Sequence, residues 1–102
     1  MTSKRQPLSD SEISEQLSHL PGWERDGDKL KKLFKFGAYT DGLIFATLVG
    51  AAAEKLDHHP DILINWRKVT VTFSTHDAGN KITAVDVKAA EAVEALPYKT
   101  AP

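Results

Sequence analysis

Residues 62–75 read Ile-Leu-Ile-Asn-Trp-Arg-Lys-Val-Thr-Val-Thr-Phe-Ser-Thr, and their pattern decides the fold class. Within residues 68–75 apolar and polar side chains alternate, which is the period of a strand with one buried face; the apolar ones are Val69, Val71 and Phe73. Residues 62–64 form a second short apolar strand, and residues 65–67 are a plausible turn. The stretch therefore predicts an antiparallel hairpin, one face of which packs against the core.

Residues 41–59 come before this hairpin and are predicted to form the longest helix. Apolar side chains recur along it at helical spacing, and they are Ile44, Leu48, Ala51, Ala52 and Leu56. Pro60 disfavours helical geometry at the residue before it. The helix is therefore expected to end at His58 and His59.

Shorter elements are predicted on the N-terminal side. Ser9 and Glu12 have the spacing of a capping box, so a helix is expected to begin there and to stop at Pro21-Gly22. Residues 23–36 resemble two strands joined by a tight turn at Asp26-Gly27, where both turn positions need a positive φ.

A last helix is expected to begin near Thr83, and its inward side chains would be Val85, Ala89, Ala92, Val93 and Leu96. The order of elements is then α-β-β-α-β-β-α. This order predicts a two-layer α+β fold, an antiparallel four-stranded sheet with the helices packed on one face. We expect one domain over residues 9–97, a loose N-terminal arm over residues 1–8 and a C-terminal tail over residues 98–102.

Composition narrows the class of protein. The 102 residues are 41% hydrophobic and 26% charged, with a formal net charge of −1, so no bulk field attracts nucleic acid or anionic lipid. Cysteine is absent, which excludes thiolate zinc sites and cysteine nucleophiles. The apolar run 42–53 is too short to cross a bilayer, and the first residues lack the apolar core of a signal peptide. A cytoplasmic location, with no membrane partner and no direct nucleic-acid partner, is the expectation.

Three of the four histidines gather around the predicted hairpin. His58 and His59 lie at the end of the long helix, and His76 lies at the end of the strand 68–75, so the three imidazoles can converge. Histidine is the side chain suited to moving protons near neutral pH. Glu54 precedes His58 by four residues, so the two are expected to share a helix face, where the carboxylate would favour imidazolium. His19 is expected to be a solvated residue at a helix end.

Each of these residues has a simpler interpretation. A His-His pair often marks a solvated helix end, and Asp86 fits the third position of a helix capped by Thr83. Trp66 is either an ordinary aromatic beside a turn or a flat surface beside a planar ligand. A metal site is not expected, because the sequence has no H-x3-H or H-x-H spacing.

Taken together, these residues resemble the signature of the pterin-4a-carbinolamine dehydratase family, Glu-x3-His-His-Pro-x5-(Tyr/Trp)-x9-His-x9-Asp. The residues that match it in order and spacing are Glu54, His58, His59, Pro60, Trp66, His76 and Asp86. The resemblance covers roughly residues 9–96. Its main departures are Trp66, where many members have Tyr, and Asn80-Lys81 in the loop after His76.

The resemblance implies a lyase that dehydrates 4a-hydroxytetrahydrobiopterin to quinonoid dihydropterin and so recycles the cofactor of aromatic amino acid hydroxylases. It implies no metal and no redox cofactor. The catalytic residues would be His58, His59 and His76. The residues that bind substrate or support the site would be Glu54, Asp57, Pro60, Trp66, Thr75, Asp77 and Asp86.

The resemblance also implies a homodimer or homotetramer, with functional coupling to a hydroxylase. Two other classes of function stay open. Some relatives act as dimerisation cofactors of a homeodomain transcription factor or assist enzyme assembly, so this chain could be a binding module. A metal-dependent hydrolase or lyase is the other alternative.

Overall fold

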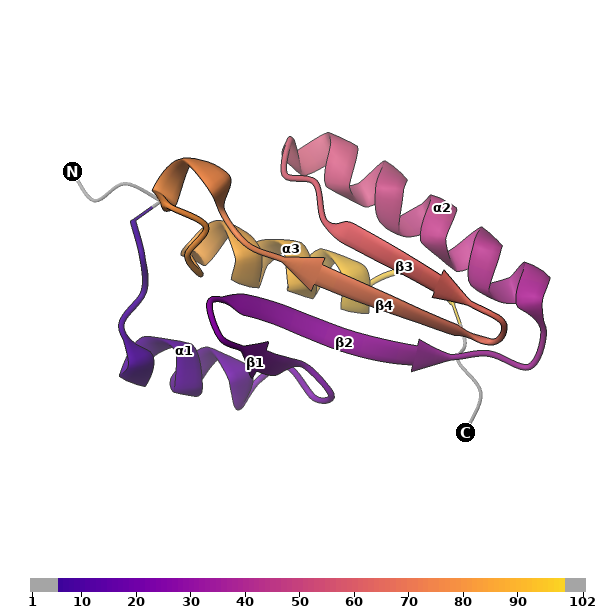
Figure 1. Ribbon diagram of the computed structural model, residues 1–102, viewed down its shortest axis with the longest axis horizontal. Helices are drawn as coiled ribbons and strands as arrows, with labels where there is room; N and C mark the ends of the chain where they lie inside the picture. The colour runs from indigo at the N-terminus through magenta and orange to yellow at the C-terminus, as the bar shows by residue number, and fades with distance from the viewer. Residues whose placement is uncertain (1–5, 99–102) are drawn as a thin grey trace.

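The computed structural model describes residues 6–98, and its helices and strands follow the predicted order (Figure 1). A short 3₁₀ helix, η1, is added between the last strand and the last helix. The elements are α1 (Asp10–Leu17), β1 (Glu24–Asp26), β2 (Lys29–Lys35), α2 (Tyr39–Leu56), β3 (Asp61–Asn65), β4 (Lys68–Phe73), η1 (His76–Ala78) and α3 (Ala84–Glu94).

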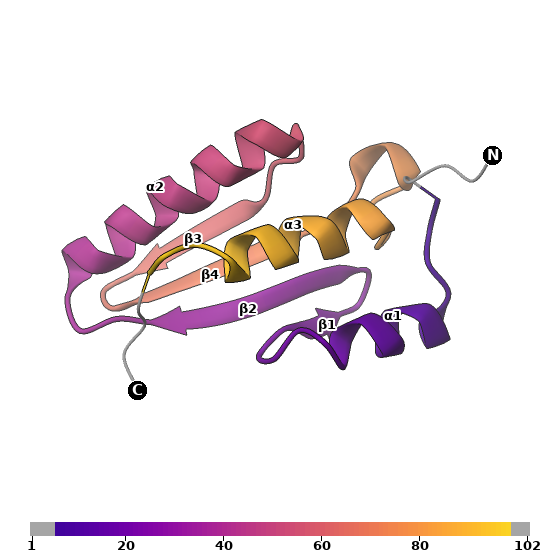
Figure 2. The same ribbon diagram turned by 180° about the vertical axis from the view of Figure 1, so that it is seen from behind.

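The four strands form one antiparallel sheet in the order β1-β2-β4-β3. The helices lie on one face of it, as Figures 1 and 2 show from opposite sides. The predicted α+β class is therefore confirmed. Within the described residues, 6–98, no helix is both long and apolar enough to cross a membrane.

The hairpin of β3 and β4 has the predicted alternation. Val69, Val71 and Phe73 are at most 1% exposed, and they face the helices. Partners in the register share their face, so Leu30 of β2 packs beside Phe73, and the core continues across the sheet. The turn between β3 and β4 is at residues 66–67.

The buried stripe of α2 differs from the predicted one. The helix buries Gly42, Phe45, Ala46, Val49 and Ala53, whereas Ile44 is 52% exposed. Residues 42–53 are apolar on nearly every side of the helix, so periodicity alone does not select the face. Gly42 contributes to the choice, because a Cβ there would lie 3.2 Å from Cγ2 of Val69.

The buried face of α3 also differs in part from the predicted one. Val87, Ala89, Ala90 and Val93 are its buried apolar residues, whereas Val85 and Ala92 are half-buried. Leu96 packs against the core from beyond the helix end.

The first hairpin turns one residue later than predicted. Asp26 pairs with Lys29, so the two turn residues are Gly27 and Asp28. Only Gly27 of these two has a positive φ, +60°. The turn therefore needs a left-handed residue at one position, and glycine supplies it.

The predicted terminal segments are partly ordered by contacts. Pro7 pairs with Thr83, and the Leu8 N–H donates to the Ile82 carbonyl at 2.8 Å, so the end of the expected loose arm is fastened beside α3. Tyr98 packs against Phe36 and Phe45 with ring centroids 5.5 and 5.8 Å away. The rest of the predicted arm and tail, residues 1–5 and 99–102, lies outside the described residues.

Candidate active site

The C-terminus of α2 decides where the histidine pair lies. The helix ends at Leu56, and Asp57 adopts a left-handed conformation with φ 50° and ψ 43°. This end comes earlier than predicted, so His58 and His59 lie outside the helix. The chain leaves the helical path before Pro60, and the helical spacing between Glu54 and His58 no longer places them on one face.

The predicted contact between Glu54 and His58 is wrong for this reason. His58 is buried, and its Nε2 lies 2.6 Å from Oδ1 of Asp86. Glu54 instead accepts from Nε2 of His59 at the surface. Each imidazole of the pair therefore has its own carboxylate. The His59–Glu54 pair lies in solvent, and the His58–Asp86 pair lies in the protein interior.

Asp86 has the position in α3 that the sequence predicts. Thr83 is the N-cap, and the Thr83 N–H donates to Oδ2 of Asp86 at 2.8 Å in a capping box. The hydroxyl of Thr75 donates to the same oxygen at 2.9 Å. Asp86, Thr75 and Thr83 are each 0% exposed, and every buried side-chain polar atom within residues 6–98 has a hydrogen-bond partner. Asp86 thus caps α3 and also holds His58.

His76 enters the site from the end of the other strand. It opens η1 directly after Thr75, whose N–H donates to the Lys81 carbonyl at 2.9 Å and closes the loop. The Lys81 ammonium reaches Asp28 at 2.9 Å, which ties the loop to the turn between β1 and β2. This hydrogen bond lowers the pKa of the Asp28 carboxyl below its ordinary value.

The three predicted histidines line one hollow of about 470 Å³. Its lining residues are Asp57, His58, His59, Pro60, Asp61, His76 and Asp77. Ligand pockets have volumes of this order. The His59 side chain is 56% exposed and His58 is 6% exposed, so the hollow combines a solvent-facing imidazole with a nearly buried one. No group of acidic and histidine side chains in residues 6–98 is arranged to hold a metal ion.

Other predicted site residues lie further away. Thr75 and Asp86 are behind the hollow, in contact with His58 or its carboxylate partner rather than in the lining. Trp66 is 71% exposed at the turn between β3 and β4. This turn is at the opposite end of the hairpin from Asp61, about 13 Å along the strand. Within one chain, the fold does not bring Trp66 to the histidines.

Sequence reasoning did not select Asp61, although it lines the hollow. It is the first residue of β3, directly after Pro60, and it pairs with Thr72 in the register. A strand that begins at the proline places its first side chain beside the histidines. Asp57 and Asp77 also line the hollow, and both are among the site residues that the family resemblance implies.

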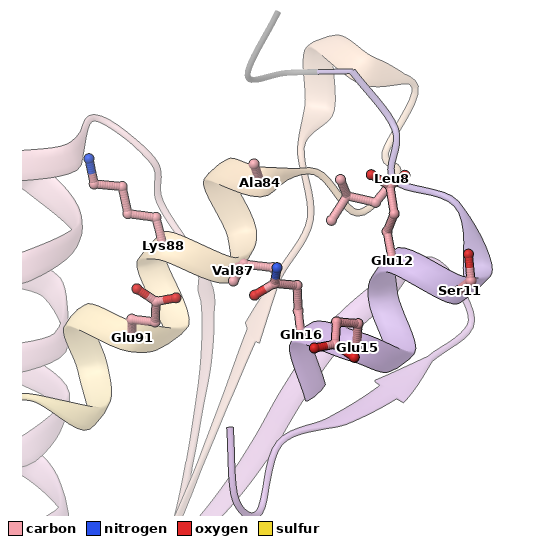
Figure 3. Close-up of a pocket in the computed structure, with 9 residues that line it drawn as sticks. All are labelled: Leu8, Ser11, Glu12, Glu15, Gln16, Ala84, Val87, Lys88 and Glu91. Atoms are coloured by element: carbon pink, nitrogen blue, oxygen red, sulfur yellow. The ribbon is translucent and has the colours of Figure 1, made fainter. Parts of the chain in front are cut away.

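A second hollow of about 520 Å³ lies between α1 and α3 (Figure 3). Its lining residues are Leu8, Ser11, Glu12, Glu15, Gln16, Ala84, Val87, Lys88 and Glu91. It contains carboxylates and one lysine but no imidazole. Because imidazole changes its charge near neutral pH, the histidine hollow is the better candidate for proton-transfer chemistry.

Comparison with known proteins agrees with this geometry. The family described as pterin 4 alpha carbinolamine dehydratase matches residues 6–96 of the chain. The chain belongs to this family. The matched range includes the histidine hollow and the Asp86 network behind it.

Curated relatives are similar over nearly their whole length. A protein of Mycobacteroides abscessus, provisionally named pterin-4-alpha-carbinolamine dehydratase, is 44% identical over 85% of this chain and 92% of its own. A protein of Natronomonas pharaonis with the same provisional name is 44% identical over 87% of this chain and 94% of its own.

Two solved structures have a similar fold. One, described as a transcriptional coactivator/pterin dehydratase from Brucella melitensis, has a TM-score of 0.82 and 34% identity over 88% of this chain and 97% of its own. The other is described as a pterin dehydratase-like protein identified as a RuBisCO assembly factor in the alpha-carboxysome. It has a TM-score of 0.61 and 26% identity over 76% of this chain and 90% of its own.

Proposed function

We propose that the chain is a hydro-lyase that dehydrates a 4a-hydroxytetrahydropterin, such as 4a-hydroxytetrahydrobiopterin, to the quinonoid dihydropterin. The observation that carries the proposal is the convergence of His58, His59 and His76 on one hollow. The family supplies the reaction class, and this arrangement supplies groups able to perform it. The product would return to an aromatic amino acid hydroxylase after reduction.

The reaction requires one proton to be delivered and one to be removed. The bond between C4a and the hydroxyl oxygen breaks, and the hydroxyl leaves as water after it receives a proton from a general acid. The lone pair of the adjacent ring nitrogen forms the new carbon–nitrogen double bond. A general base then takes the proton of the ring system. A positioned acid and a positioned base each accelerate such steps by roughly 10²–10⁴-fold.

The histidines differ in how they could serve these steps. His59 and His76 are exposed in the hollow, so they can exchange protons with the substrate and with water. His58 is nearly buried, and its Nε2 faces a carboxylate that only accepts. A neutral His58 therefore has its proton on Nε2 and its lone pair on Nδ1, the form of a base. Asp57, Asp61 and Asp77 add polar groups around the substrate.

A dehydration assay tests the proposal. The 4a-hydroxytetrahydropterin is generated by phenylalanine hydroxylase, and its conversion is followed spectroscopically with the purified chain. We expect turnover to exceed the spontaneous rate and to fall roughly 10-fold or more in His59→Ala and in His76→Ala. His19→Ala is the matched control, because His19 is an exposed histidine paired with Glu15 away from the hollow. Full activity in both site variants, or no activity in the wild type, would refute the proposal.

The intact histidine set favours catalysis over a purely binding role. The described assembly factor and coactivator show that this fold also serves other roles in relatives.

A metal-dependent reaction is the remaining alternative, and a chelator distinguishes it. We expect the wild-type rate to be unchanged by chelation, and a loss that zinc restores would favour the alternative.

A further inference from the structure

We propose that the hydroxyl groups of Thr75 and Thr83 are positioning groups that hold Asp86 as an acceptor and so fix the tautomer and ring orientation of His58. The inference rests on the proposed function for its catalytic consequence. Its structural part, the tautomer of His58, can be measured without any activity.

The direction of the hydrogen bonds follows from the number of protons available. The Thr75 hydroxyl donates its single proton to Oδ2 of Asp86 at 2.9 Å. It therefore accepts in its 2.7 Å contact with the Thr83 hydroxyl, so Thr83 is the donor there. The Thr83 oxygen in turn accepts from the Val85 N–H at 3.2 Å. The chain of donors runs in one direction, from the first turn of α3 to the Asp86 carboxylate.

Both oxygens of Asp86 are thereby acceptors. Oδ2 receives two hydrogen bonds, from the Thr75 hydroxyl and the Thr83 N–H. Oδ1 lies 2.6 Å from Nε2 of His58, a short distance that suits a charge-assisted bond. A carboxylate with Oδ2 fixed in this way keeps its plane, and Oδ1 then points at the imidazole. Nε2 of His58 must bear the proton that completes the bond.

The surroundings leave the His58 ring little freedom. Its plane is stacked on Phe73, with ring centroids 5.9 Å apart and an angle of 13° between the planes. His58 is 6% exposed and its three polar neighbours are 0% exposed, so water does not compete for these bonds. The lone pair of neutral His58 is thereby restricted to Nδ1. The last residue before η1 and the N-cap of α3 would then determine which nitrogen of a catalytic imidazole is basic.

The test compares Thr75→Val with Thr75→Ser. Valine keeps the shape of threonine and removes the hydroxyl, whereas serine keeps the hydroxyl. Thr70→Val is the control, since Thr70 is a half-buried threonine of β4 whose register partners, Leu33 and Leu63, do not line the hollow. Each protein is examined by ¹⁵N NMR of the imidazole nitrogens and by the dehydration assay.

In the wild type we expect neutral His58 to be the Nε2–H tautomer. In Thr75→Val we expect a mixture of tautomers and a kcat about 10-fold lower with little change in KM, because Thr75 is 0% exposed and does not line the hollow. Thr75→Ser should restore the wild-type tautomer and kcat, and Thr70→Val should leave the tautomer and kcat unchanged. A wild-type His58 protonated on Nδ1 would overturn the inference even if the valine variant did not fold. An active Thr75→Val with an unaltered tautomer would also overturn it, whereas an inactive wild type with the expected tautomer would refute only the proposed function and the catalytic consequence.

Discussion

Asp86 of α3 and His58, just beyond the end of α2, form a buried pair, with Oδ1 of Asp86 2.6 Å from Nε2 of His58. Within α3, the carboxylate of Asp86 completes the capping box at the start of the helix. Its second oxygen makes it the partner of a histidine 28 residues earlier in the chain. The same carboxylate therefore stabilises a helix terminus and orients a side chain of the candidate active site.

The first prediction concerns the stability that Asp86 provides. A lost helix cap alone costs about 1 kcal/mol. Asp86→Ala should instead lower the free energy of unfolding by about 3–5 kcal/mol, because it leaves His58, Thr75 and the Thr83 N–H without their buried acceptor. Urea denaturation measures this. A loss of only about 1 kcal/mol would mean that capping is the whole contribution of Asp86 to stability.

The second prediction separates the three histidines by stability. His58→Ala should cost about 2 kcal/mol or more, since it removes a partner from a buried carboxylate. His59→Ala and His76→Ala change exposed side chains and should stay within about 0.5 kcal/mol of the wild type. Thermal and urea unfolding of the three variants give the comparison. Equal losses in all three would contradict the burial of His58.

Much of the fold could be predicted because its patterns are local. The alternation in residues 68–75, the capping boxes at Ser9 and Thr83 and the apolar strand 62–64 each correspond to an element of the structure. The buried face of α2 could not be predicted, because its sequence is apolar almost all round and only packing against the sheet selects Phe45 and Val49. The hairpin turn at Gly27 was displaced by one residue, since the strand register is set by pairing across the sheet.

The convergence of the three histidines could be predicted, but the pairs that they form with carboxylates could not. The end of α2 near Pro60 and the end of β4 correctly place three histidines together. The partners depend on the backbone of Asp57, a non-glycine residue with a positive φ that no local pattern in the sequence indicates. This one residue turns His58 away from Glu54 and toward Asp86. Trp66 was expected at the site from the resemblance, and the length of the β3–β4 hairpin separates it from the histidines.

The third prediction concerns Glu54 and His59. Because both side chains are more than half exposed, Glu54→Gln should change the free energy of unfolding by less than about 1 kcal/mol. It should still lower turnover by roughly 10-fold, since Glu54 orients His59 at the hollow. In a double variant with His59→Ala, no further loss is expected.

Glu15→Gln is the matched control for this cycle, because it removes the carboxylate of another exposed pair, with His19. It should leave turnover unchanged. Additive losses from Glu54→Gln and His59→Ala would mean that Glu54 acts through some other group.

The fourth prediction concerns pH and the loop that carries His76. The Lys81 hydrogen bond lowers the pKa of Asp28, so the pair contributes stability above the pKa of the unfolded carboxyl, about 3.9, and loses it as pH falls through the lower folded value. Lys81→Met should raise the Asp28 pKa toward its ordinary value. Arg25, 3.9 Å away, keeps a smaller effect.

An NMR titration of the Asp28 carboxyl in both proteins measures the shift. Lys88→Met removes an exposed lysine of α3 and should leave the titration as it is in the wild type. A titration of Asp28 that is identical in wild type and Lys81→Met would show that the Lys81 contact does not persist in solution.

The fifth prediction is that the chain forms a homo-oligomer through α2. The outer side of this helix leaves Tyr39 47%, Leu43 36% and Ile44 52% exposed, and adjacent large apolar side chains on a surface indicate an interface. Light scattering at micromolar concentration should give at least twice the 11.2 kDa mass of the chain. Ile44→Asp should shift the protein to the monomer with its circular dichroism retained, because an aspartate would be buried without a partner in the interface.

Leu63→Asp tests the other exposed apolar surface. Leu63 is 59% exposed on β3, which is an edge strand of the sheet, and edge strands can also pair with another chain. If α2 forms the contact, Leu63→Asp keeps the wild-type mass while Ile44→Asp does not. If Leu63→Asp is monomeric and Ile44→Asp keeps the wild-type mass, the interface is at the sheet edge. A wild type that is monomeric at all concentrations tested would refute the prediction of an oligomer. A contact through α2 would also explain why a helix with so few polar residues leaves Ile44 in solvent within a single chain.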